Sequence, residues 1–310
     1  VVREKLLTGG TFMYSFQNGL GSNFISLISY YEMSPLNWIS ILFNENSVRN
    51  AITFILILKI GFAGGFFQRF LRYTYRRNDF STCIFSVMYA LSAFTLGYYW
   101  NVMFFDTIAL FPLTMLGIVK ICREGRWKTF TFALALSLIS NYYVGYFTCL
   151  FSVLMFAAAS IIEFRGIKNW FYSFWLMLRS ALLGGAMSAF MLIPAYLGLQ
   201  TTYSADDRSI IQKLIAILKE DPKYYHHWYS LIANTISYNE PTKVEGLPNF
   251  ACGMLAVLLF GVFLFSNGIK IREKISSCAM LFIIAISCNM RQLNYIWHPD
   301  IKLKAIVILP

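Results

Sequence analysis

Two carboxylates in this chain stand where an acid or a base could act. Asp106 lies at the start of a long apolar segment, and Glu32 lies among aromatic residues in the polar stretch that opens the chain. A carboxylate with water on one side and an apolar wall on the other has a raised pKa, which suits a proton acceptor. A helix N-cap at Asp106 and a solvated loop position at Glu32 are the structural alternatives. Both are candidate catalytic residues, and Asp106 is the stronger.

Two cations, Lys59 and Arg179, lie inside apolar segments. A Lys or Arg at mid-membrane costs about 2.5–3.5 kcal/mol, which usually indicates a partner or a function. Lys59 is the deeper of the two, and we expect its ammonium group to hold a phosphate. Arg179 lies near the end of its segment, where snorkelling to the lipid headgroups explains it more simply.

Polar aromatic residues form a third group of candidates. Sugars are held by hydroxyl and amide groups beside an aromatic face, although tyrosines are also ordinary residues at a membrane–water interface. A histidine near the end of the chain could transfer a proton or bind a phosphate. The candidate substrate contacts are Tyr30, Tyr31, Asn141, Tyr142, Tyr143 and His298.

No spacing in the sequence is typical of a metal site. The six cysteines form no C-x-x-C pair, and the adjacent His226 and His227 diverge on a helix without a third ligand at a recognisable distance. We therefore predict no metal ligands. A divalent metal enters only as a candidate cofactor for a departing phosphate group.

The composition determines which elements position these residues. The 310 residues are 57% hydrophobic and 13% charged, about half the charge of a soluble domain. This excludes a water-soluble globule and predicts an all-α polytopic membrane protein. The net charge of +11 sits in short loops between apolar segments, so we expect a lipid bilayer as the partner and no nucleic acid.

About eight segments are apolar enough for membrane helices, given that about 20 residues cross the bilayer core. The short loops at 69–77, 123–128, 165–168 and 270–274 are all basic, which places them on the inner side. The expected spans are 51–71, 80–98, 104–121, 129–141, 143–162, 178–199, 250–267 and 275–290.

This topology divides the chain into five regions. Residues 1–50 are predicted to form an extracytoplasmic loop with short helices along the membrane surface. Residues 51–199 form the transmembrane core, 200–249 a second extracytoplasmic loop, 250–290 further membrane helices, and 291–310 a truncated extracytoplasmic tail. The chain starts without Met and stops after a polar loop, so we expect a fragment.

Six segments, in the same order and spacing, resemble the bacterial YfhO-like membrane proteins. They are residues 18–24, 30–37, 58–64, 105–117, 141–146 and 297–298. The resemblance implies a fold like that of type C glycosyltransferases. It also implies transfer of a sugar from a polyprenyl-phosphate donor to a cell-envelope polymer such as teichoic acid, at the outer face of the bacterial plasma membrane.

The resemblance also implies roles for particular residues. Asp106 matches the acidic position of the family, and we expect it to open into water beside residues 1–50 and to act as general base. Lys59 or His298 would offset charge on the departing phosphate. Two features depart from the family pattern: its acidic segment ahead of the first loop is missing, and Pro299 and Asp300 replace a Gly and an aromatic residue.

Two other functions are compatible with the same residues. A transporter or flippase for a lipid-linked sugar would also need intramembrane cations, and its expected mark is an inverted repeat, which we do not find in the sequence. An inactive truncated scaffold is the third reading, favoured by the missing ends.

Overall fold

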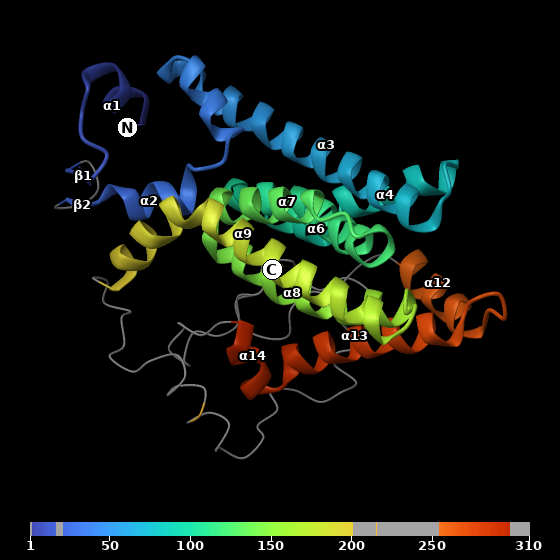
Figure 1. The fold of residues 1–310 in the computed structure, drawn as a ribbon. Helices are drawn as coiled ribbons and strands as arrows, with labels where there is room; N and C mark the ends of the chain where they lie inside the picture. Colours follow the sequence, from blue (N-terminus) through green and yellow to red (C-terminus); the bar gives the residue numbers. More distant parts are fainter. Residues whose placement is uncertain (1, 17–20, 201–214, 216–253, 298–310) are drawn as a thin grey trace.

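The apolar segments form helices that pack side by side in the computed structural model of this protein, which describes residues 2–16, 21–200, 215 and 254–297 (Figure 1). A polypeptide crossing a bilayer must satisfy its backbone hydrogen bonds internally, and a helix does so within one segment. Each of the eight expected spans coincides with helix in the described residues, and the fold is that of an all-α polytopic membrane protein. Five of the described helices are long and apolar enough to cross a membrane.

Short elements precede the bundle. Strands β1 and β2 pair antiparallel, with Tyr14 opposite Asn23. A turn of 3₁₀ helix, η1, then leads toward the first long helix. The elements are α1 (Val2–Thr8), β1 (Tyr14–Ser15), β2 (Ser22–Asn23), α2 (Phe24–Tyr31), η1 (Asn37–Leu42) and η2 (Glu45–Ser47).

The long helices follow the expected spans with two main differences. The span at 80–98 is divided into α4 and α5, and α9 begins at Ile167 instead of 178. As expected, the chain breaks at Asn141, between α7 and α8. The elements are α3 (Val48–Tyr75), α4 (Phe80–Ala90), α5 (Ala93–Gly97), η3 (Val102–Phe104), α6 (Phe105–Glu124), α7 (Lys128–Ser140), α8 (Tyr142–Ile162), α9 (Ile167–Gln200), α12 (Met254–Phe265), α13 (Ile271–Asn289) and α14 (Arg291–Trp297). The expected loop at 200–249 lies outside the described residues apart from Gln200 and Ile215.

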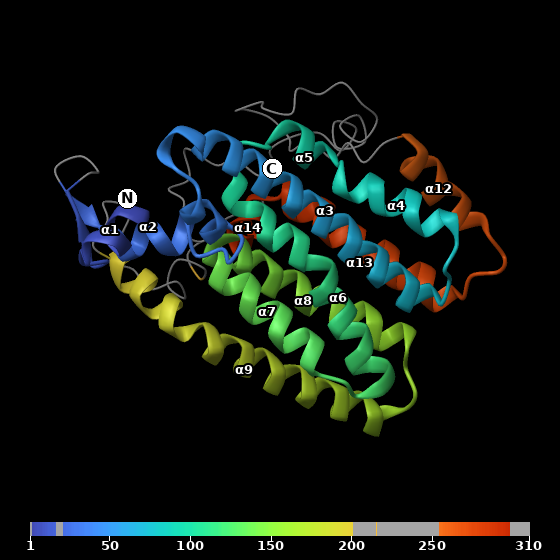
Figure 2. The same cartoon turned by 90° about the horizontal axis from the view of Figure 1, so that it is seen from above.

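The basic loops share one end of the bundle. Figure 2 shows the turns α3–α4, α6–α7, α8–α9 and α12–α13 at the same end, opposite α1 and α2. Arg123 links three of these turns. Its Nη1 donates to the carbonyl oxygens of Tyr73 and Thr74 at 3.2 and 2.9 Å, and its Nε lies 2.6 Å from Oε1 of Glu163. This common end is the side that the positive-inside rule assigns to the cytoplasm.

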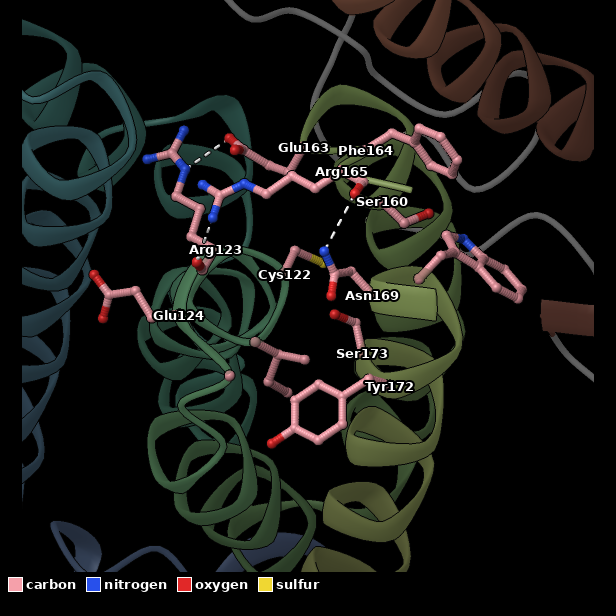
Figure 3. Close-up of a pocket in the computed structure, with 13 residues that line it drawn as sticks. Cys122, Arg123, Glu124, Ser160, Glu163, Phe164, Arg165, Asn169, Tyr172 and Ser173 are labelled. Carbon is pink, nitrogen blue, oxygen red and sulfur yellow. Dashed lines mark hydrogen bonds and ion pairs between the residues drawn. The ribbon is translucent and has the colours of Figure 1, made fainter. Parts of the chain in front are cut away.

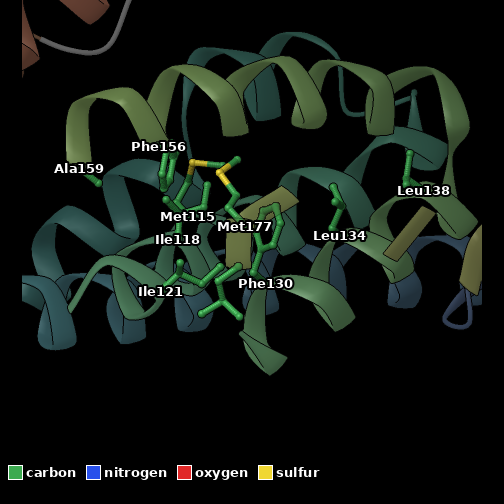
Figure 4. Packing of buried hydrophobic residues seen from close by; sticks show 10 residues of the cluster. Met115, Ile118, Ile121, Phe130, Leu134, Leu138, Phe156, Ala159 and Met177 are labelled. Carbon is green, nitrogen blue, oxygen red and sulfur yellow. The ribbon is translucent and has the colours of Figure 1, made fainter. Parts of the chain in front are cut away.

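The packed core lies between α6, α7, α8 and α9 (Figure 4). Helix α7 has only 13 residues and would span about 20 Å at 1.5 Å per residue. Its neighbours bury most of its side chains, and Phe132 and Leu136 lie on the side that stays exposed. The core residues are Met115, Ile118, Ile121, Phe130, Leu134, Leu138, Phe156, Ala159, Leu176 and Met177.

Glycine allows the closest contact in this core. A Cβ added to Gly117 of α6 would lie 2.4 Å from the backbone nitrogen and Cα of Phe130 in α7. A similar contact joins Gly145 of α8 to Leu138 of α7, at 3.0 Å. Close approach at small residues is a main source of helix association in membranes, where burial of apolar surface contributes little.

We expect Gly117→Ala to destabilise the protein by about 1–3 kcal/mol, because backbone atoms cannot yield to the added methyl group. Gly61 on α3 is the matched control, since a Cβ there would meet nothing within 4 Å. Gly61→Ala should be neutral or slightly stabilising. Thermal unfolding of both variants in detergent measures the difference, and equal midpoints would contradict this account of the α6–α7 contact.

Candidate functional site

Asp106 forms a buried ion pair with Lys59. Asp106 lies in the first turn of α6, where the helix dipole favours an anion, and Lys59 lies in the middle of α3. The Lys59 Nζ is 2.5 Å from Asp106 Oδ2, and the two side chains are 0% and 4% exposed. Lys59 and Asp106, which the sequence indicated as separate functional residues, are thus partners in one ion pair.

The remaining hydrogen bonds of the pair reach the segment between α2 and α3. Lys59 Nζ donates to Asn37 Oδ1 at 2.7 Å and to the carbonyl oxygen of Val102 at 3.0 Å. Ser34 Oγ donates to Asp106 Oδ1 at 2.6 Å. A Lys ammonium has three hydrogens to donate, and Asp106, Asn37 and Val102 occupy all three. In this arrangement Lys59 has no donor left for a phosphate.

The expectation that Asp106 opens into water is therefore wrong. Ser34 and Lys59 cover its two carboxylate oxygens, and the surrounding helices exclude solvent. The expected position beside residues 1–50 is confirmed, because Ser34 belongs to that region. Asp106 does not cap its helix either, since α6 follows an N-cap at Phe104. A buried carboxylate engaged with a Lys is poorly placed to take a proton from a substrate.

The turn from Tyr30 to Asn37 is held by its own polar contacts. Ser34 Oγ accepts hydrogen bonds from the backbone N–H groups of Leu36 and Asn37, at 3.1 and 3.3 Å. Asn37 Nδ2 donates to the Tyr31 carbonyl at 2.9 Å, and Trp38 Nε1 donates to the Glu32 carbonyl at 3.0 Å. The ion pair and these contacts together fix the backbone on both sides of Glu32.

A cavity of about 1140 Å³ lies beside this turn, between α1, α2, η1 and the C-terminal half of α9. Most of its lining is apolar, and Glu32 and Asn37 are among its polar residues. Glu32 has an exposed side chain that faces this cavity. Partial burial in the cavity wall raises the pKa of the Glu32 carboxyl, and the positive charge of Lys59 lowers it in part. Glu32 is thus accessible and partly desolvated, as an enzymic base requires.

The Asn141 segment joins the first loop to the α7–α8 hairpin. Asn141 is fully buried, donates from Nδ2 to the Tyr30 carbonyl at 2.9 Å, and accepts from the Val144 N–H at 2.9 Å as the N-cap of α8. The Tyr30 ring makes edge contacts with Tyr31 and Tyr142, at centroid distances of 4.7 and 5.8 Å. The amide of Asn141 is therefore used within the protein.

The tyrosines of this segment form one cluster. Tyr30 also contacts the Tyr143 ring, at a centroid distance of 6.3 Å. Burial, with the neighbouring tyrosines, raises the pKa of Tyr30 to about 12, so its phenol stays protonated at neutral pH. Tyr31 lines the cavity beside Glu32, which places one edge of the cluster where a ligand could meet it.

Comparison with known proteins agrees with this architecture. The family model described as bacterial membrane protein YfhO matches residues 1–299. This chain belongs to that family. A YfhO protein of Bacillus subtilis (strain 168), described as uncharacterized, is 27% identical over 224 residues, which cover 64% of this chain and 25% of that protein. The chain thus spans about a quarter of the length of this relative. No solved structure matches it.

Two further residues that the sequence indicated in this YfhO family protein are His298 and Arg179. His298 lies outside the described residues, and the preceding Trp297 packs on Phe151 of α8 at a centroid distance of 4.9 Å. Arg179 has an exposed side chain over the ring of Trp127, at 5.9 Å. Trp127 lies at the basic end of the bundle, so the Arg179 side chain extends toward that end, as snorkelling predicts. Among the described residues, no group of three His, Cys, Asp or Glu side chains could hold a metal ion.

The sequence did not predict three residues of this candidate site, which are Ser34, Asn37 and Arg3. Ser34 and Asn37 lie within the 30–37 segment. Their contacts with Asp106 and Lys59 could not be predicted, because the sequence does not indicate which polar residues a distant buried charge will contact. Arg3 lines the cavity and makes one long contact, 3.5 Å from its Nη2 to Asn44 Oδ1. Nothing in the sequence around Arg3 indicates a site, because α9 and α2 complete the cavity from distant parts of the chain.

Proposed function

We propose that this protein is a membrane glycosyltransferase that moves a sugar from a polyprenyl-phosphate donor to a cell-envelope polymer, such as teichoic acid, on the outer face of the bacterial plasma membrane. One observation carries the proposal. A large, mostly apolar cavity has Glu32 in its wall. Helices α1 and α2, which line it, lie at the end of the bundle opposite the basic loops (Figure 2). Apolar walls with a few polar groups are typical of a site for an amphipathic ligand.

Glu32 acts as the general base in this proposal. Its carboxylate takes the proton of an acceptor hydroxyl while the hydroxyl oxygen forms a bond to the anomeric carbon of the sugar. The bond from that carbon to the phosphate oxygen breaks, and the lipid phosphate leaves with the electron pair. Asp106 and Lys59 are positioning residues, because they hold the turn that carries Glu32 and do not face the cavity themselves.

The donor is bound by the remaining lining. The apolar residues of α2 and α9, among them Phe24, Ile28 and Met191, take the prenyl chain. Arg3 supplies positive charge for the phosphate, in place of Lys59, and Tyr31 offers an aromatic face to the sugar. The Tyr142 and Tyr143 rings remain candidate contacts of the sugar, and His298 remains a candidate contact of the phosphate. No step is assigned to a metal ion, since the described residues offer no set of ligands.

The test is sugar transfer by the purified full-length protein in vesicles. It is given labelled polyprenyl-phosphate sugar on the outer side and teichoic acid as acceptor, and a Glu32→Gln preparation is the control. We expect label in the polymer with the native protein and transfer about 10²–10⁴-fold slower with the control. Movement of intact donor across the bilayer without transfer would favour the flippase, and neither transfer nor movement would favour an inactive scaffold. Both results would contradict the proposal.

A further inference from the structure

A second pocket lies at the basic end of the bundle, far from the cavity at Glu32. Its volume is about 220 Å³, and its walls come from the end of α6, the end of α8 and the first two turns of α9. Figure 3 shows the polar side chains that surround it. The residues that matter here are Arg123, Glu124, Glu163, Arg165, Asn169 and Ser173.

Among the charged residues around this pocket, Arg165 has no carboxylate partner in the described part of the chain. Arg123 pairs with Glu163 at 2.6 Å, and its Nη1 donates to two carbonyls of α3. Glu124 pairs with Arg126 at 3.1 Å. Arg165 is exposed, donates only to the Arg123 carbonyl at 3.3 Å, and pairs with no carboxylate in the described part of the chain. An Arg guanidinium has five N–H donors, so most of those of Arg165 remain for a ligand.

A hydroxyl group on the pocket wall, that of Ser173, also has no hydrogen-bond partner among the described residues. Ser173 is 9% exposed, and its Oγ makes no hydrogen bond to any residue that the structure describes. In Figure 3 this hydroxyl points into the pocket beside Asn169, whose Nδ2 donates to the Arg165 carbonyl at 3.2 Å. Ser173 lines the pocket, so this hydroxyl is free to donate a hydrogen bond to a ligand there.

The start of α9 adds positive potential at the same place. The helix begins at Ile167, directly after Gly166, which has no side chain to accept the N–H groups of the first turn. These groups and the helix dipole make the N-terminus of a long helix attractive to a phosphate. Arg165, Asn169 and Ser173 line the pocket, and α9 begins beside it at Ile167.

We propose that this pocket binds the phosphate of an anionic phospholipid headgroup. Basic pockets between membrane helices on the cytoplasmic side are recognised sites for such lipids. A lipid, as opposed to a soluble phosphate, is favoured by the exposed Phe164 and by Trp170, which line the pocket as aromatic anchors do at headgroup depth. The proposal does not depend on sugar transfer, which we place at the opposite end of the bundle.

We test this proposal by native mass spectrometry of the purified protein in mixed micelles that contain phosphatidylglycerol or phosphatidylcholine. Arg165→Gln should weaken binding of phosphatidylglycerol about tenfold, because a charge-assisted bond to phosphate is lost. Ser173→Ala should weaken it about threefold. Arg272→Gln is the matched control, since it removes the same charge from an exposed position at the same end but outside the pocket, and it should leave binding unchanged.

Three outcomes would overturn the proposal. Equal losses with Arg165→Gln and Arg272→Gln would indicate general attraction to a basic surface. Equal binding of the two lipids would exclude recognition of an anionic headgroup. Displacement of the lipid by glycerol 3-phosphate would assign the pocket to a soluble phosphate. Arg165 is exposed, so its replacement should not disturb folding, which the elution volume of each variant checks.

Discussion

Glu32→Gln is expected to lower the rate of sugar transfer by about 10²–10⁴-fold, the usual contribution of a general base. The amide keeps the size of the side chain but cannot accept the proton of the acceptor hydroxyl. The measurement is the initial rate of label transfer by the full-length protein in vesicles. Glu273→Gln is the control, because it removes a carboxylate from the opposite end of the structure, and it should leave the rate unchanged.

The pH dependence distinguishes a base from a residue that only binds. A general base works in its deprotonated form, so the rate should fall as the pH falls through the pKa of Glu32. That pKa lies above the ordinary value because burial disfavours the charged form. The acidic limb of kcat/KM should therefore lie above the pH of about 4.3 expected for a free Glu and should disappear in Glu32→Gln. An unchanged limb in that variant would assign the proton acceptor to another group.

Lys59→Met is expected to destabilise the protein by about 3–5 kcal/mol, because it leaves the Asp106 carboxylate buried without a counter-charge. Asp106→Asn should lower the stability by a similar amount, because it leaves the Lys59 ammonium buried without a counter-charge. Unfolding by denaturant in detergent measures both. Lys168→Met, on the exposed face of α9, is the control and should change stability by less than about 0.5 kcal/mol.

The double variant Lys59→Met/Asp106→Leu tests whether the two residues act as a pair. Replacing both charges by apolar groups removes the desolvation penalty along with the attraction, so most of the stability should return. If the double variant loses the sum of the two single losses, the residues are not coupled.

The same double variant also tests the positioning role. Without Lys59 and Asp106, the contacts to Asn37 and Ser34 that hold the turn are gone, so kcat should fall although the protein is folded. The charge of Lys59 lowers the pKa of Glu32, and its removal should move the acidic limb of the activity profile to higher pH. A purely structural pair would leave the position of that limb unchanged.

The sequence by itself determined the membrane helices and the grouping of the basic loops at one end of the bundle. Long apolar runs become helices because backbone hydrogen bonds in a bilayer must be made within the segment, and this requirement is local. The basic loops therefore marked one end, and Asn141 marked the break between α7 and α8, since its side chain caps the helix that follows.

Only the tertiary structure decided what the polar residues do. Ser34 and Asp106 are 72 residues apart, and no local pattern states that they share a hydrogen bond. Lys59 and Asp106 each had the marks of a functional residue in the sequence, because a charge in an apolar segment is costly, but packing of α3 against α6 makes each the partner of the other. The cavity that exposes Glu32 is likewise assembled from α1, α2 and α9. Local hydrogen bonds select helices, whereas the partner of a buried charge depends on which helices meet in space.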